Sequence, residues 1–297
     1  MRLLLPPKFD YVAPRSLSEA IDHLRSRGDE AKIIAGGQSL IPLLKLRLAS
    51  PKLLVDIGQI RGLDYIKESD GSLRIGAMTR MADVAQSELL RRRHSIIHDA
   101  SLVVADPLVR NRGTVGGNLA HGDPANDLPA VTLALEAEFA IEGPSGVKTF
   151  MARDFFLDTF TVALGHEEIL TEVRVPLPPR TSGGAYLKVE QKVADFATAG
   201  VAVFVRLGTN GQCERAGIGL TNVGPKAIKA VKAEEALSGR GLNDAVAVAE
   251  AATLAAEASD PVSDIRGTAE YKRGLVKLLV ERATNLAYRR ALGGGVK

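Results

Sequence analysis

The residues best suited to chemistry lie in two glycine-rich segments, Ala35–Ser39 and Arg110–Asn118, which read AGGQS and RNRGTVGGN. Glycine adopts positive φ values and has no Cβ to obstruct a ligand lying against the backbone. A turn built from such residues can point successive N–H groups at an anion such as a phosphate. An isolated Gly-Gly pair is more often an ordinary turn. Two such segments in one chain favour a site for the two phosphates of a dinucleotide.

The side chains give little indication of metal binding or of nucleophilic catalysis. His94 and His98 have the i, i+4 spacing of metal ligands, but no glutamate follows His94 and no third ligand is near. Ser39 and Thr114 follow glycines without a histidine in a recognisable nucleophile motif. We therefore expect no metal site and no catalytic residue, and a cofactor that performs the chemistry itself. For His121, a ligand contact and a hydrogen-bonded loop histidine both stay open.

The composition is that of an ordinary globular protein. The chain has 297 residues, of which 45% are hydrophobic and 25% charged, with a net charge of +3 and no tryptophan. This length predicts two domains. The mild charge and the scarcity of aromatic residues argue against a nucleic-acid partner. No apolar run reaches the ~18 residues of a membrane-spanning helix.

Cys213 is the only cysteine in the chain. A single cysteine forms no intramolecular disulfide and predicts a reducing compartment, the cytoplasm. An iron–sulfur cluster normally needs several cysteine ligands, which this chain cannot supply. If the protein takes part in metal redox chemistry, the metal must therefore lie on another polypeptide.

The first glycine segment lies inside a predicted strand–loop–helix–strand unit. A capping box at Ser16–Glu19 starts the helix that precedes this unit. The unit itself consists of a buried strand over 31–35, a helix over 40–48 and a second strand over 53–57. Such an order favours a parallel strand pair with a crossover. The usual dinucleotide fingerprint and the P-loop motif are both absent, so a nucleotide would be held by a different loop design.

The remaining elements follow from capping residues, turn residues and hydrophobic periodicity. Thr79 and Asp127 are predicted helix N-caps, and Pro107 is predicted to block a helix that ends near Ala105. The other predictions are strands over 73–77 and 169–175, a hairpin of 138–141 with 147–150, a proline- and glycine-rich linker over 176–184, three antiparallel strands over 186–192, 199–207 and 212–221, and three helices over 229–238, 242–258 and 264–291.

Several segments together resemble a known family. They are Ala35-Gly36-Gly37-Gln38-Ser39-Leu40, Leu54-Val55-Asp56-Ile57, Ile75 to Arg80, Val109 to Asn118, Asp123 to Ala130, Glu168-Ile169-Leu170, and Lys188 with Asp195-Phe196-Ala197. In these segments the chain resembles the FAD-binding medium subunits of molybdenum hydroxylases, the xanthine dehydrogenase family. Within that family the resemblance is to the medium chains of aerobic carbon monoxide dehydrogenases.

The resemblance implies an α+β fold in two parts. Residues 1–177 would form an FAD-binding domain of the vanillyl-alcohol-oxidase type, with two α/β subdomains over about 1–57 and 58–177. Residues 178–297 would form a three-stranded antiparallel sheet with a helical bundle.

The resemblance also implies which residues bind FAD. The predicted cofactor contacts are Ala35, Gly36, Gly37, Gln38, Ser39, Leu40, Thr114, Val115, Gly116, Gly117, Asn118, Asp127, Leu170, Lys188 and Phe196. The two glycine segments would hold the diphosphate and neighbouring groups, and Asp127 would contact the ribose or adenine side. Leu170 and Lys188 would lie along the cofactor, with the Phe196 region near the isoalloxazine. Independently of the resemblance, weakly basic Lys188 and Lys192 would favour an anionic reduced flavin, although surface lysines of an exposed strand are the commoner case. Lys192 stands where the family more often has arginine, and Phe196 stands where some members have tyrosine.

The implied partners are an iron–sulfur small subunit and a molybdopterin large subunit, assembled as a dimer of heterotrimers. Electrons would pass from molybdenum through the 2Fe-2S clusters to FAD, and then to quinone, NAD or oxygen. Carbon monoxide is the favoured substrate of the whole complex, and the complex would lie in the cytoplasm or against the inner face of the membrane. The alternatives are an aldehyde, purine or N-heterocycle hydroxylase complex, a self-sufficient flavin oxidoreductase, and a non-enzymatic nucleotide-binding scaffold.

Overall fold

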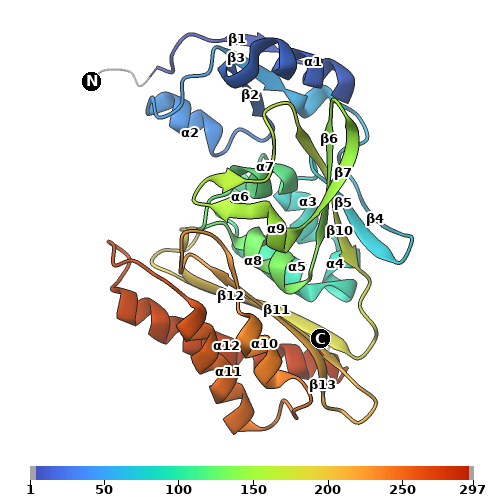
Figure 1. The fold of residues 1–297 in the computed structure, drawn as a ribbon, viewed down its shortest axis with the longest axis vertical. Helices are drawn as coiled ribbons and strands as arrows, with labels where there is room; N and C mark the ends of the chain where they lie inside the picture. The colour runs from blue at the N-terminus through green and yellow to red at the C-terminus, as the bar shows by residue number, and fades with distance from the viewer. Residues whose placement is uncertain (1–4, 294–297) are drawn as a thin grey trace.

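A computed structural model describes residues 5–293, and these residues form three larger sheets arranged along the long axis of the molecule, together with a separate two-stranded sheet (Figure 1). The predicted glycine-rich C-terminal tail lies outside the described residues beyond Gly293. The strands are β1 (Asp10–Val12), β2 (Ala31–Ile34), β3 (Leu53–Asp56), β4 (Ile66–Ser69), β5 (Ser72–Gly76), β6 (Glu138–Gly143), β7 (Gly146–Met151), β8 (Phe156–Asp158), β9 (Thr161–Val162), β10 (Ile169–Pro176), β11 (Ser182–Glu190), β12 (Ala197–Leu207), β13 (Cys213–Thr221) and β14 (Ile228–Lys229).

Helices cover these sheets and connect their strands. They are α1 (Leu17–Arg27), α2 (Leu40–Lys45), α3 (Met81–Gln86), α4 (Glu88–Arg93), α5 (Ser95–Val103), α6 (Pro107–Arg110), α7 (Val115–His121), α8 (Asp127–Ala134), α9 (Ala152–Phe155), α10 (Val231–Leu237), α11 (Ala245–Ala258) and α12 (Ala269–Ala291). No helix of residues 5–293 is both long and apolar enough to cross a membrane.

The N-terminal sheet has the order β1-β3-β2, and both of its strand pairs are parallel. The predicted parallel pair and its crossover are therefore confirmed. Ser16 caps α1, because its hydroxyl accepts a hydrogen bond from the Glu19 amide at 3.2 Å. Helix α2 ends at Lys45, earlier than predicted, and Arg47 beyond it has a positive φ of 59°.

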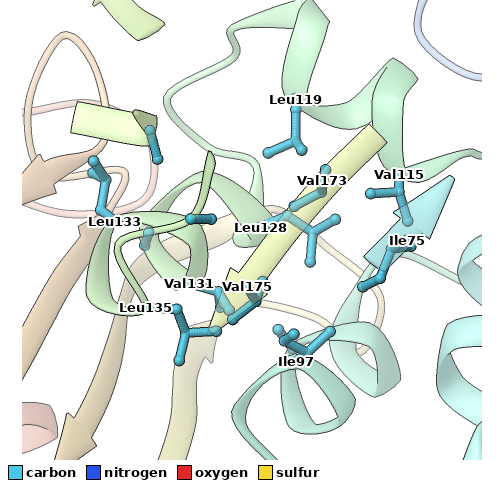
Figure 2. Close-up of a cluster of buried hydrophobic side chains, with 14 of the residues drawn as sticks. Ile75, Ile97, Val115, Leu119, Leu128, Val131, Leu133, Leu135, Val173 and Val175 are labelled. Atoms are coloured by element: carbon cyan, nitrogen blue, oxygen red, sulfur yellow. The ribbon is translucent and has the colours of Figure 1, made fainter. Parts of the chain in front are cut away.

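The central sheet has the order β4-β5-β10-β6-β7, with antiparallel neighbours. The predicted strands at β5 and β10 and the hairpin of β6 with β7 are confirmed. Figure 2 shows the core on one face of this sheet, where Ile75 and Val173 from the strands meet helix side chains. Leu119 comes from α7 and Leu128 from α8, so burial of these residues fixes both helices against the sheet.

Three helix boundaries differ from the sequence predictions. Thr79 caps no helix, since its hydroxyl donates to the Tyr65 carbonyl and accepts from the Tyr65 amide, each at 3.0 Å. Pro107 begins α6, where its missing N–H costs nothing, and the helix before it ends at Val103. Asn126 occupies the N-cap position of α8, and Asp127 is the first helical residue.

The C-terminal sheet has four antiparallel strands in the order β11-β12-β13-β14. The expectation of three strands was wrong, because β14 is too short to show a pattern in the sequence. Strand β11 also begins at Ser182 instead of 186, which shortens the predicted linker to residues 177–181. Every residue of β12 except Arg206 is buried, so both faces of the sheet are covered. Helices α10 and α12 pack on one face with α11 against them, while α5 and α8 pack on the other face.

Helix α8 lies unusually close to β13. A Cβ on Gly217 would overlap the Ala134 carbonyl oxygen, and a Cβ on Gly219 would overlap the Ala130 carbonyl oxygen. All eight residues of α8 are buried, so the helix is enclosed between the central and C-terminal sheets. Glycine is needed at both positions because any larger side chain would push the two layers apart.

Gly217→Ala should therefore destabilise the folded chain by about 1–3 kcal/mol, the usual cost of overpacking a tight contact. The matched control is Gly274→Ala, because Gly274 lies in α12 with open space around its Cβ position. This control should stabilise the chain by about 0.5–1 kcal/mol. Urea unfolding of the two variants checks both signs. Equal stabilities would contradict the close contact.

Candidate functional site

The two glycine segments adjoin in space. The first glycine loop (residues 35–40) follows β2 and includes Leu40, the first residue of α2. The second glycine loop (residues 110–118) runs from the last residue of α6 through the first turn of α7. A Cβ on Gly36 would overlap the Arg112 carbonyl oxygen, and a Cβ on Gly117 would lie 3.8 Å from the Ala35 Cβ. The loops therefore meet, although residues 41–109 separate them in sequence.

The first glycine loop presents free backbone amides. No backbone carbonyl within residues 5–293 accepts a hydrogen bond from the amides of residues 36–40. Gly37 has a φ of 73°, in the left-handed region that favours glycine. Unpaired N–H groups that precede a helix are suited to binding a phosphate.

The second glycine loop uses most of its amides within the protein. The Val115 amide donates to the Thr79 carbonyl at 3.0 Å, and the Gly116 amide donates to the Ala77 carbonyl at 2.8 Å. Gly117 donates to the Thr114 hydroxyl at 3.1 Å, which caps α7. These bonds hold the loop against the central sheet. They leave the Thr114 amide without a backbone acceptor among the described residues, and the Asn118 Oδ1 atom buried without a partner.

Three cationic residues lie within or close to the two loops in the sequence. Lys32 precedes the first loop, and Arg110 and Arg112 lie in the second. Within residues 5–293, no carboxylate lies within 4.0 Å of these three side chains. Arg110 donates only to the neutral carbonyls of residues 104 and 105. The charge and the free amides together fit the two phosphates of a dinucleotide.

Asp127 and Lys188 form a buried ion pair between α8 and β11. The Lys188 Nζ atom lies 3.5 Å from the Asp127 Oδ2 atom, and their side chains are only 2% and 7% exposed. The Tyr186 hydroxyl donates to the Asp127 Oδ1 atom at 2.7 Å. Burial raises the pKa of Asp127 to about 6, although Lys188 and Tyr186 act in the opposite direction. The reading of Lys188 as a surface lysine is therefore wrong.

This ion pair is connected to the second glycine loop. The Asn126 amide group donates from Nδ2 to the Asn118 carbonyl at 2.8 Å, and Asn126 directly precedes Asp127. Lys188 also donates to the carbonyls of Val103 at 2.5 Å and Asp195 at 3.1 Å. The site thus brings the end of the loop, α8 and β11 together.

The last two predicted contacts lie in different surroundings. Phe196, next to Asp195, is half exposed, and the Arg266 guanidinium lies 6.0 Å from its ring centre. Leu170 is buried on β10 in the core of the central sheet. The cofactor contacts of Leu170, Phe196 and Asp127 stay predictions, and both Asp127 oxygens already have protein partners.

Sequence reasoning missed three residues of the buried cluster. Tyr186 and Glu190 lie two residues on either side of Lys188, so all three side chains point to the same face of β11. That alternation was a usable signal. Thr221, whose Oγ1 atom lies 3.2 Å from the Tyr186 hydroxyl, gave none, because it comes from β13.

Comparison with known proteins finds two family models that match successive parts of the chain. Residues 7–178 match the model of the FAD binding domain in molybdopterin dehydrogenase, and residues 184–287 match the CO dehydrogenase flavoprotein C-terminal domain. The carbon monoxide dehydrogenase medium chain of Hydrogenophaga pseudoflava is 42% identical over 97% of this chain and 99% of its own. The 6-hydroxypseudooxynicotine dehydrogenase complex subunit alpha of Paenarthrobacter nicotinovorans is 39% identical over 96% of both chains.

Solved structures are similar over the same extent. A carbon monoxide dehydrogenase structure from Hydrogenophaga pseudoflava superposes with a TM-score of 0.93 at 43% identity, covering 96% of this chain and 99% of that chain. Quinoline 2-oxidoreductase from Pseudomonas putida 86 superposes with a TM-score of 0.90 at 34% identity, covering 97% and 99%.

The raised pKa of Asp127 predicts a pH-dependent stability. Since the folded-state pKa of about 6 exceeds the ordinary value of 3.8, the folded chain should lose stability as pH rises through this interval. Asp127→Asn removes this loss, so its stability relative to wild type should increase by on the order of 2–3 kcal/mol between pH 4 and pH 7. The exposed Asp22→Asn should follow wild type. Urea unfolding at both pH values checks the difference, and parallel curves for Asp127→Asn would contradict it.

Proposed function

The chain belongs to the family of FAD-binding medium subunits of molybdenum hydroxylases, and we propose that it passes electrons from iron–sulfur clusters of a partner subunit through FAD to an external acceptor. It is thus an oxidoreductase subunit of the carbon monoxide dehydrogenase and xanthine dehydrogenase type. The observation that best supports the proposed role is the contact between two glycine loops, one of which presents unpaired amides.

The residues present fit FAD. The amides of the first glycine loop and of Thr114 would bind the diphosphate, with Lys32 and Arg112 offsetting its charge. The buried Asn118 Oδ1 atom would accept a hydrogen bond from the cofactor, which would satisfy an otherwise costly unpaired group. FAD, when bound, supplies the capacity to accept and release electrons.

The buried pair would act on the flavin side of the site. The Lys188 ammonium is held by two backbone carbonyls and by the Asp127 carboxylate, so it would act on a nearby flavin through its fixed charge and not through a free N–H group. Phe196 would cover the isoalloxazine edge, and Asp127 and Leu170 would contact the cofactor from α8 and β10. These roles follow the family resemblance.

We propose the domain division 1–177 and 178–297, with the first part of the vanillyl-alcohol-oxidase type. The short connection over 177–181 between two sheets supports the main boundary. The gap between β3, which ends at Asp56, and β4, which begins at Ile66, supports a subdomain boundary near residue 57.

The proposed partners are an iron–sulfur small subunit and a molybdopterin large subunit. One cysteine, Cys213, cannot ligate a cluster, and burial raises the pKa of its thiol to about 11. Carbon monoxide is the proposed substrate of the complex because medium chains of carbon monoxide dehydrogenases match nearly the whole chain. The second candidate is an N-heterocycle hydroxylase, because nicotine- and quinoline-oxidising relatives share the same architecture.

Gly117→Val should abolish FAD retention. A Cβ at this position would lie 2.8 Å from the Thr114 hydroxyl that caps α7, and between the two glycine loops. The control is Gly274→Val, which places the same side chain in open space on α12. Flavin absorbance per chain after purification measures retention, and circular dichroism verifies the fold. A folded Gly117→Val chain with a full complement of FAD would contradict the assignment.

The proposed role assigns substrate oxidation to the partner subunits and electron transfer to this chain, and it predicts a second result. Carbon monoxide should bleach the flavin absorbance of the complex purified through this chain, and should leave the isolated flavin-loaded chain unchanged. If an N-heterocycle bleaches the complex and carbon monoxide does not, the second candidate holds. Bleaching of the isolated chain by either compound would refute the electron-transfer role.

A further inference from the structure

A row of three side chains on β11 faces α8. Tyr186, Lys188 and Glu190 occupy alternate positions along the strand, so their side chains lie on one face of β11. On this face Tyr186 is buried in the core that also contains α8. The Lys188 Nζ atom lies 3.1 Å from a Glu190 carboxylate oxygen and 3.5 Å from an Asp127 carboxylate oxygen. One buried cation is therefore shared by two carboxylates on different elements.

The charged groups around this cluster are few. Asp195, on the loop after β11, offers Lys188 its backbone carbonyl, while its carboxylate pairs with Arg266 at 2.9 Å. Helix α5 contributes the carbonyl of Val103 at its C-terminal end, and β13 contributes the neutral Thr221 hydroxyl. With all groups ionised, Asp127, Lys188 and Glu190 carry a net charge of one negative unit.

Tyr186 is held by hydrogen bonds from both its hydroxyl and its backbone amide. Its hydroxyl donates to Asp127, and its backbone amide donates to the Asp99 carboxylate at 3.3 Å. Asp99 in turn pairs with Arg290 of α12 at 2.5 Å. Gly200 on the neighbouring strand leaves room for the phenol, because a Cβ there would overlap the hydroxyl. The Tyr186 hydroxyl is therefore held on Asp127 by contacts from several elements.

Tyr186 and Glu190 act on Asp127 in opposite directions. A hydrogen bond donated to a carboxylate favours its charged form, and a neighbouring negative charge disfavours it. The pKa of Asp127, raised by burial to about 6, is lowered by the Tyr186 hydroxyl and raised by Glu190. Loss of the hydroxyl would shift Asp127 towards the neutral acid near pH 7, and the positive charge of Lys188 would then be less compensated.

We propose that Tyr186 and Glu190 are positioning residues that set the charge of the Asp127–Lys188 pair, and thereby the reduction potential of the FAD bound beside it. The inference rests on the proposed function, which places FAD against this pair. The hydrogen bond from Asn126 to Asn118 supports the placement, because it connects the pair to the second glycine loop.

The test measures the flavin midpoint potential of the full chain between pH 5 and pH 9. Protonation of Asp127 adds positive charge and raises the potential, so the wild-type curve should change slope near the pKa of Asp127. In Tyr186→Phe the change of slope should move to higher pH by about one to two units, the equivalent of one lost charge-assisted hydrogen bond. In Glu190→Gln it should move to lower pH. Both variants should have a more positive potential than wild type at pH 7.

Tyr65→Phe is the matched control. The Tyr65 hydroxyl also donates to a carboxylate, that of Glu172 at 2.5 Å, but in the central sheet. Its curve should superpose on wild type. If Tyr186→Phe fails to fold, Glu190→Gln carries the test alone, since the Glu190 side chain is partly exposed.

The outcomes separate the inference from the proposed function. Opposite displacements in Tyr186→Phe and Glu190→Gln support the inference, because a merely structural defect would not move the two curves in opposite directions. Flavin-loaded variants whose curves superpose on wild type overturn it. A folded wild-type chain that binds no flavin overturns the proposed function instead.

Discussion

The contact between the first and second glycine loops is the constraint on which the rest of the site depends. The first loop follows β2 of the N-terminal sheet, whereas the second lies between two helices and is hydrogen-bonded to residues that follow β5 of the central sheet. Gly36 meets the Arg112 carbonyl so closely that no side chain fits between them. The proposed diphosphate site therefore needs both loops. The unpaired amides of the first loop have a defined position only because the second loop is fixed to the central sheet through Ala77 and Thr79.

The sequence predicted the elements that depend on local signals. The capping box at Ser16, the glycine turn of β6 with β7 and the apolar strands β5 and β10 have short-range patterns, and the structure contains them. It also indicated that the two glycine loops belong to one site, although spacing alone did not distinguish their roles. The first loop presents its amides, whereas the second uses most of its amides to pack against the central sheet.

Features that depend on distant partners were missed. The sequence around Lys188 is that of an ordinary strand lysine, but in the structure α8 and α5 cover its strand. Asp127 has the sequence context of a helix cap, but in the structure its carboxylate accepts a hydrogen bond from Tyr186 of β11. Burial of these charges is a property of three elements that are far apart in sequence. Strand β14 escaped prediction for a different reason, because two residues carry no periodicity.

Helix α8 is in contact with both neighbouring layers, since its backbone lies on Gly217 and Gly219 while its side chains enter the core of the central sheet. The covalent connection over 177–181 therefore contributes little to holding the layers together. A protease that cut this segment would release no fragment under native conditions, and the nicked protein would migrate as one particle.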